Sequence, residues 1–153
     1  ANFLVDREFA ISVGGFDENF VGTAHNYERE FSDRCICAGQ SLFYYADAVV
    51  FHLKETAGGI RSYGHFLKTA RAHHAVGAYY YILRSARVRS KAKRILQRVV
   101  QRLATKTHLK EPWWIPLTFI GDITGLMWAM MLIRSGPKLM RSDGGKIDHE
   151  PVK

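Results

Sequence analysis

The chain has 153 residues, 47% of them hydrophobic, and a formal net charge of +8, so it is long and apolar enough to bury one modest core. Residues 1–60 have a net charge of −5 (nine acidic, four basic), and residues 61–153 have a net charge of +13 (five acidic, eighteen basic). This division predicts that the two segments have different partners, and that the partner of the second segment is an anionic surface. Cys35 and Cys37 are two residues apart on a predicted helix, which argues against a disulfide between them and against a zinc site built from this pair alone.

The beginning of the chain predicts a strand followed by a helical turn. Residues 2–5 form an apolar approach that predicts a short strand, residues 6–13 predict a helical turn, and Gly14-Gly15 end it. The chain opens without an initiator Met and without the basic and apolar regions of a signal peptide, so we expect further residues upstream.

A helix and two strands are predicted next. Over residues 27–38 apolar side chains recur on one helical face, and Gly39 ends the helix. The sequence SLFYYADAVVFHL, residues 41–53, predicts two strands, the second over Ala48–Leu53. Residues 1–61 therefore predict an α/β arrangement of mixed order.

Residues 62–110 predict helices with a basic surface. Between Arg84 and Lys110 there are ten Lys or Arg and no acid, while apolar side chains repeat every three to four residues. Two interpretations of this basic amphipathic helix stay open. It is a solvated helix packed on a neighbour, or it lies on anionic lipid head groups, where each cation contributes about 1 kcal/mol. A nucleic-acid module is a weaker interpretation, because no Phe, Tyr or Trp accompanies the basic stretch.

Residues 111–135 are an apolar segment, followed by a polar tail, residues 136–153. Within the segment, 21 residues from Trp113 carry one charge, Asp122, and would reach about 31 Å as a helix, enough to cross a bilayer core. Asp122 in mid-span argues against a simple crossing, at roughly 2.5–3.5 kcal/mol on insertion scales. The glycines of GDITG are interpreted as sites of helix plasticity rather than of a specific dimer. Crossing, a re-entrant segment and a buried core helix stay open, and membrane association is predicted.

The motifs GGFDENF, YEREFSDRCICAG, FYYADAVVFHL and GGIR occur in this order, with a short loop after the first. Together they resemble the C-terminal half of the catalytic domain of glycosyltransferase family 2, which has the GT-A fold. The resemblance covers residues 2–61, and its specificity comes from the order and spacing of the motifs rather than from any single one. It implies a partial GT-A fold followed by a mostly helical, membrane-associated C-terminal region.

The resemblance implies roles for individual residues. Glu28 falls on the family's catalytic base, the carboxylate that removes the proton of the acceptor hydroxyl. Arg34 falls on the family's arginine and is predicted to bind substrate. His52 is implied as a ligand of a divalent cation or a contact of the leaving diphosphate, and Arg61 as a cation that neutralises the diphosphate. Asp17 is expected to cap the turn after the two glycines and to contact the acceptor.

The residues alone leave other interpretations open. Glu28 could complement the dipole at the start of its helix, His52 could be a hydrogen-bonded core histidine, and Arg61 could be a solvated cation. Glu30, the family's second acid, is interpreted as the i,i+4 partner of an arginine and as structural. Tyr27 stands where the family more often has a carboxylate, which is a departure from its pattern.

The family's nucleotide-binding layers and its Asp-x-Asp metal motif have no counterpart in the chain. The resemblance therefore implies part of a membrane-associated glycosyltransferase that passes a sugar from a nucleotide-diphosphate donor to an acceptor hydroxyl. The donor-binding half would lie outside the chain, and Mg²⁺ or Mn²⁺ would be the cofactor of the complete enzyme. A glycan or lipid-linked acceptor and anionic membrane lipids are the expected partners, at the cytoplasmic face of the plasma (inner) membrane. The alternative is a non-catalytic membrane-bound remnant or scaffold.

Overall fold

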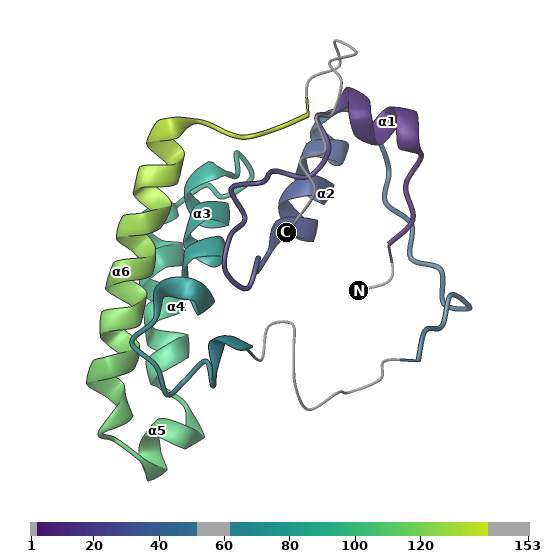
Figure 1. The fold of residues 1–153 in the computed structure, drawn as a ribbon. Coiled ribbons are helices and arrows are strands. Elements are labelled where there is room, and N and C mark those ends of the chain that lie inside the picture. The colour runs from purple at the N-terminus through teal and green to yellow at the C-terminus, as the bar shows by residue number, and fades with distance from the viewer. Residues whose placement is uncertain (1–2, 52–61, 141–153) are drawn as a thin grey trace, which may run out of the picture.

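The computed structural model describes residues 3–51 and 62–140, and these residues form helices and irregular segments without a β-strand (Figure 1). The 3₁₀ turn η2 comes directly before α3, residues 62–63 are also in 3₁₀ conformation, and six α-helices make up the remaining regular structure of this part of the chain. In chain order the elements are α1 (Arg7–Ser12), α2 (Tyr27–Cys37), η2 (Ala72–His74), α3 (Val76–Arg84), α4 (Lys91–Leu103), α5 (Lys106–Lys110) and α6 (Trp114–Ser135).

The α/β fold predicted for residues 1–61, as a partial GT-A fold, is wrong for the described part of that segment. Residues 3–6 and 41–51 contain no strand, and residues 52–61 lie outside the described residues. Phe43, Tyr44 and Phe51 are at least 90% exposed. A strand is stable only when a neighbouring strand pairs with its backbone groups and covers its apolar face. The described residues offer no such neighbour, so the β-rich composition of residues 41–51 has no sheet to join.

The helices predicted near the N-terminus are confirmed, and their ends follow from local chemistry. Asp6 caps α1, since its carboxylate accepts a hydrogen bond of 2.8 Å from the Phe9 amide. Beyond α1, Gly14 has φ +88°, a left-handed conformation that a glycine adopts without strain. Gly39, with φ +85°, follows α2 in the same way.

The C-terminal region is mostly helical, as predicted, but the basic stretch is not one helix. Residues 85–90 form a turn between α3 and α4, and a short break at Ala104-Thr105 separates α4 from α5. Figure 1 shows α3 and α4 beside the long helix α6, with α2 on the other side of α3.

Helix α3 is the centre of this packing. Its residues from Val76 to Ile82 are all buried. Successive residues of a helix are rotated by about 100°, so the three tyrosines at 79–81 point in different directions. Phe20 and Ala129 join these tyrosines in the main core, with the Phe20 and Tyr80 ring centroids 5.1 Å apart. The segment after α1 and the helix α6 therefore pack against the same short helix.

Helix α6 has the reverse of the polarity expected for a helix on the surface of a soluble protein. It is long and apolar enough to cross a membrane by length and composition. Its inner face, against η2, α3 and α4, buries small and polar residues: Thr118, Gly121, Asp122, Gly125 and Ala129. Its outer face exposes apolar ones: Leu117, Phe119, Ile120, Ile123, Met127, Met130, Met131 and Ile133. The apolar face of α6 is therefore left uncovered by the described residues.

The predicted objection to membrane insertion, the charge of Asp122, disappears in the folded chain. Asp122 is 1% exposed, and its Oδ1 accepts a hydrogen bond of 3.1 Å from Arg102 of α4. Because the carboxylate points into the protein and is paired, it does not need to enter lipid.

The two glycines of α6 serve close packing rather than helix plasticity. A Cβ atom added at Gly121 would lie 3.1 Å from the Thr69 carbonyl oxygen, and one added at Gly125 would lie 2.5 Å from the Ala75 Cβ. The segment before α3 can lie this close to α6 only because these positions carry no side chain.

Gly125→Val is predicted to destabilise the chain by about 1–3 kcal/mol, because the added atoms overpack the contact with Ala75. Thr124→Val is the matched control, since it places the same side chain at the neighbouring exposed position. Thermal unfolding in a neutral detergent, followed by circular dichroism, measures both. Equal unfolding temperatures for the two variants would show that the close approach is not required.

Candidate functional site

The Gly-Gly turn is built around Arg34, whose guanidinium comes from α2. Its Nη1 donates to the Val13 carbonyl oxygen and its Nη2 to that of Gly15, at 2.6 Å. Gly15 has φ +60°, and a Cβ added there would lie 2.7 Å from the Met140 Sδ. The glycine therefore permits both the turn and the approach of the C-terminal segment.

Glu30 joins this arginine to a second one. It is 3% exposed, and its Oε1 accepts hydrogen bonds from the Nε of Arg34 at 2.9 Å and the Nε of Arg84 at 2.8 Å. Its Oε2 accepts from the Arg34 Nη2 at 3.0 Å. The predicted i,i+4 pair of Glu30 and Arg34 is confirmed, and it is structural: Glu30 links α2 to the end of α3.

Asp17 completes this arginine network from the other side of Arg84. Its Oδ2 lies 3.2 Å from the Arg84 Nε and accepts a hydrogen bond of 2.7 Å from the Tyr80 hydroxyl. Its Oδ1 accepts from the backbone amides of Asn19, at 3.1 Å, and Lys138, at 3.0 Å. Burial raises the pKa of Tyr80 to about 12, so its hydroxyl keeps the proton that it donates. Asp17 caps the turn, as predicted.

Asp33 makes a second, more exposed connection between α2 and the end of α3. Its Oδ2 accepts hydrogen bonds of 2.9 Å from the Tyr81 hydroxyl and from the Ser85 Oγ, and its Oδ1 lies 3.5 Å from the Arg87 Nε. Tyr80 and Tyr81, adjacent in the chain, thus hold two different carboxylates.

Glu28 stands apart from this network, although it lies on the same first turn of α2 as Glu30. It is half-buried, and its Oε1 accepts a hydrogen bond of 3.1 Å from the hydroxyl of the exposed Tyr27. The bond to Glu28, with burial second, raises the pKa of Tyr27, so this hydroxyl remains a donor. The two carboxylates at the start of α2 therefore differ: Glu30 is enclosed by arginines, whereas Glu28 is half-buried and bonded to Tyr27.

The structure brings together Asp17, Glu30 and Arg34 among the residues singled out from the sequence, with Arg84 added. The contacts of Asp17 and Arg34 are internal to the protein, and their role in substrate binding stays a prediction. His52 and Arg61 lie outside the described residues. Within residues 3–51 and 62–140, no group of three or more His, Cys, Asp or Glu side chains is placed to hold a metal ion. The predicted Mg²⁺ or Mn²⁺ cofactor of the complete enzyme therefore stays a prediction.

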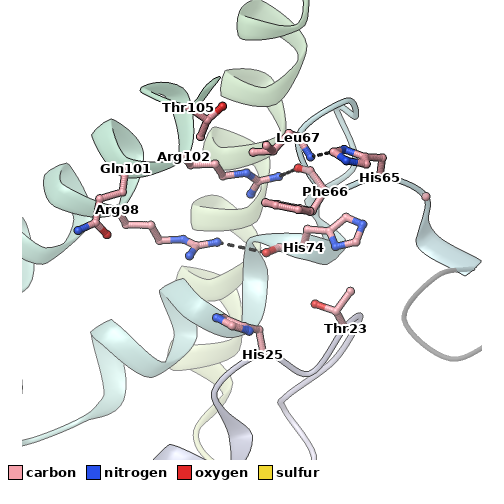
Figure 2. A pocket seen from close by; sticks show the side chains of 11 residues that line it. Thr23, His25, His65, Phe66, Leu67, His74, Arg98, Gln101, Arg102 and Thr105 are labelled. Atoms are coloured by element: carbon pink, nitrogen blue, oxygen red, sulfur yellow. Dashed lines mark hydrogen bonds between the residues drawn. The ribbon is translucent and has the colours of Figure 1, made fainter. Parts of the chain in front are cut away.

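A pocket of about 770 Å³ opens between the loop before α2, the segment before α3 and helix α4 (Figure 2). Sequence reasoning missed it. The signal was present, because Arg98 and Arg102 are four residues apart on α4 and so share a face. The lining residues are Thr23, His25, Gly64, His65, Phe66, Leu67, His74, Arg98, Gln101, Arg102 and Thr105.

No protein-family model, no curated protein and no solved structure matches this chain. The site is therefore interpreted from its own geometry, and the resemblance to glycosyltransferase family 2 stays a prediction.

Arg84→Gln is predicted to destabilise the chain by about 3 kcal/mol or more, because it leaves two buried carboxylates short of their shared cation. Arg87→Gln is the matched control, since Arg87 is half-exposed and its pair with Asp33 is worth about 1 kcal/mol at most. Denaturant unfolding in neutral micelles compares the two. Similar losses would mean that the buried network does not govern stability.

Proposed function

We propose that this chain is the acceptor-side part of a membrane-associated glycosyltransferase that passes a sugar from a nucleotide-diphosphate donor to an acceptor hydroxyl. The observation that carries the proposal is the separation of the two acids on the first turn of α2. Glu30 is enclosed by Arg34 and Arg84 and fixes the helix, whereas Glu28 is reachable and held by the Tyr27 hydroxyl. A general base must be both accessible and oriented, and the partial exposure of Glu28 and its bond to Tyr27 support this role.

In the proposed reaction Glu28 takes the proton of the acceptor hydroxyl as the acceptor oxygen forms its bond to the anomeric carbon of the sugar. The bond from that carbon to the donor diphosphate breaks at the same time, and the nucleoside diphosphate leaves with the electron pair. Tyr27 orients the Glu28 carboxylate, and the contacts of Arg34, from the last turn of α2, hold this helix against the Gly-Gly turn. Binding of the donor and of a divalent cation is assigned to residues outside the described ones.

The membrane part of the proposal rests on the two faces of α6. The buried positions 118, 121, 122, 125 and 129 run along one side, and helices α3 and α4 pack on it. Helix α4 carries five Lys or Arg in thirteen residues, so a crossing α6 would bring these charges into the hydrocarbon. We therefore place α6 along the cytoplasmic membrane surface, with its outer face in the lipid and the cations of α4 near anionic head groups.

The alternative, a non-catalytic membrane-bound scaffold, is favoured by one observation. Asp17 and Arg34, both predicted to bind substrate, are used in contacts that hold the fold together. Activity measurements on Glu28 decide between the two functions.

Glu28→Gln in the complete membrane-bound protein is predicted to lower sugar transfer by at least about 100-fold, because the amide cannot accept the proton. Donor affinity should change little. Glu18→Gln is the matched control, since Glu18 is an exposed acid of the same segment and should keep full activity. An active Glu28→Gln enzyme would remove this residue from the mechanism, and a protein without any transferase activity would favour the scaffold.

The double variant Ile123→Glu, Met127→Glu is predicted to reduce partitioning into anionic vesicles by about 10-fold or more, because it places two charges on the outer face of α6. Leu42→Glu, Phe43→Glu is the control, since it changes two exposed apolar side chains away from α6. Vesicle co-sedimentation measures both. Unchanged sedimentation of the α6 variant would mean that this face is not the one in lipid.

A further inference from the structure

The pocket in Figure 2 has a charge that the protein itself does not balance. Two arginines and three histidines contribute to its lining, and no acidic residue does. The described carboxylate that reaches these arginines is Asp122, which lies behind them on α6 and is bonded to Arg102. The two guanidinium groups of the lining therefore have one carboxylate near them, and that carboxylate lies outside the lining.

Arg102 is largely enclosed and incompletely bonded. It is 7% exposed, its Nη1 donates to Asp122 at 3.1 Å, and its Nη2 donates to the Phe66 carbonyl oxygen at 2.8 Å. Its Nε is buried without a hydrogen-bond partner among the described residues. A buried N–H without a partner is rare and costly, so a group that could accept from it would stabilise the site.

Arg98, one turn earlier on α4, has the same character. Its Nη2 donates to the His74 carbonyl oxygen at 3.1 Å, and its guanidinium carbon lies 5.1 Å from the centre of the Tyr79 ring. Its Nε also has no partner within the described part of the chain. Burial lowers the pKa of Arg98 from its ordinary value.

Two of the three pocket histidines, His25 and His74, have a lowered pKa, chiefly because of burial. Burial first, and Arg98 second, lower the pKa of His25. The pKa of His74 is lowered in the same direction by burial and by Arg102. An anion between these groups would offset the repulsion and accept hydrogen bonds from both guanidinium and imidazole nitrogens.

We propose that this pocket binds the phosphate or diphosphate group of a ligand, with Arg98 and Arg102 as the binding cations. Guanidinium groups suit phosphate oxygens because their planar set of donors matches two oxygens at once. The remaining lining includes Phe66 and Leu67, and the volume of about 770 Å³ leaves room for an organic group attached to the phosphate. The ligand is either a lipid with a phosphate head group or a soluble phosphate ester, and the proposal does not depend on Glu28.

Calorimetric titration of the chain in phosphatidylcholine nanodiscs with inorganic pyrophosphate tests the site. Arg98→Gln is expected to weaken binding at least about 10-fold, and Arg98→Lys to weaken it less, because it keeps the charge but loses the planar donors. Arg94→Gln is the matched control, since it removes an exposed arginine one turn away on the same helix, outside the pocket lining, and should leave affinity unchanged.

A second variant guards against loss of folding. Arg102→Gln alone would leave Asp122 buried without its cation, so Arg102→Gln is combined with Asp122→Asn, which removes both charges together. Circular dichroism verifies that each variant keeps its helices. Folded double variants are expected to bind pyrophosphate at least about 10-fold more weakly.

A parallel titration with phosphatidic acid in the nanodiscs distinguishes the two sources of phosphate. Binding of pyrophosphate with the expected dependence on Arg98 assigns the site to soluble phosphate esters. The same dependence with phosphatidic acid alone assigns it to a lipid head group. If neither probe binds, or if Arg94→Gln and Arg98→Gln weaken binding equally, the proposal is wrong.

Discussion

The fold depends on the burial of Arg84 between two carboxylates that come from different segments. Asp17 follows the Gly-Gly turn and Glu30 lies on α2, while Arg84 ends α3, the most buried helix. Enclosed charges are stable only when each is paired and hydrogen-bonded. Removing water from this contact therefore fixes the turn, α2 and α3 in one arrangement, and that arrangement determines which acid at the start of α2 remains reachable.

This contact also explains why acid gathers at the beginning of a basic chain. The charge division suggested two segments with separate partners, but some acids of the first segment form ion pairs with arginines of the second. Asp17 and Glu30 meet Arg84, and Asp33 lies near Arg87. Several described cations without an acidic partner, Lys91, Lys93, Arg94 and Arg98, lie on α4, the helix that borders the pocket and packs on α6.

Local signals in the sequence predicted helices well and tertiary partners poorly. The Asp6 cap, the Gly-Gly stop and the spacing of Glu30 and Arg34 depend on neighbours within four residues, so they could be read directly. The strands predicted in residues 41–53 depended on partner strands that the sequence could not identify. Likewise, the role of Arg84, 54 residues from Glu30, follows from packing alone.

The apolar segment, residues 111–135, also shows that the sequence does not identify tertiary neighbours. Its length and composition predicted a membrane helix, and a helix long and apolar enough to cross a membrane is present. Which face of this helix is buried and which is exposed could not be predicted, because that depends on which neighbours cover Gly121, Asp122 and Gly125. The arginines of the pocket were overlooked for a similar reason: in sequence they were two cations among ten.

The segment after α6 returns to the Gly-Gly turn. The side-chain Nδ2 of Asn19 donates to the Gly136 carbonyl oxygen at 2.7 Å, and the backbone amide of Lys138 donates to Asp17. The helix proposed to rest on lipid is thus connected rigidly, by hydrogen bonds, to the turn that supports α2, and not through a flexible linker. In the proposed enzyme, the height of Glu28 above the bilayer would then be fixed by the fold. Acceptors would be selected by how far their reactive hydroxyl protrudes from the membrane, before any sugar is recognised.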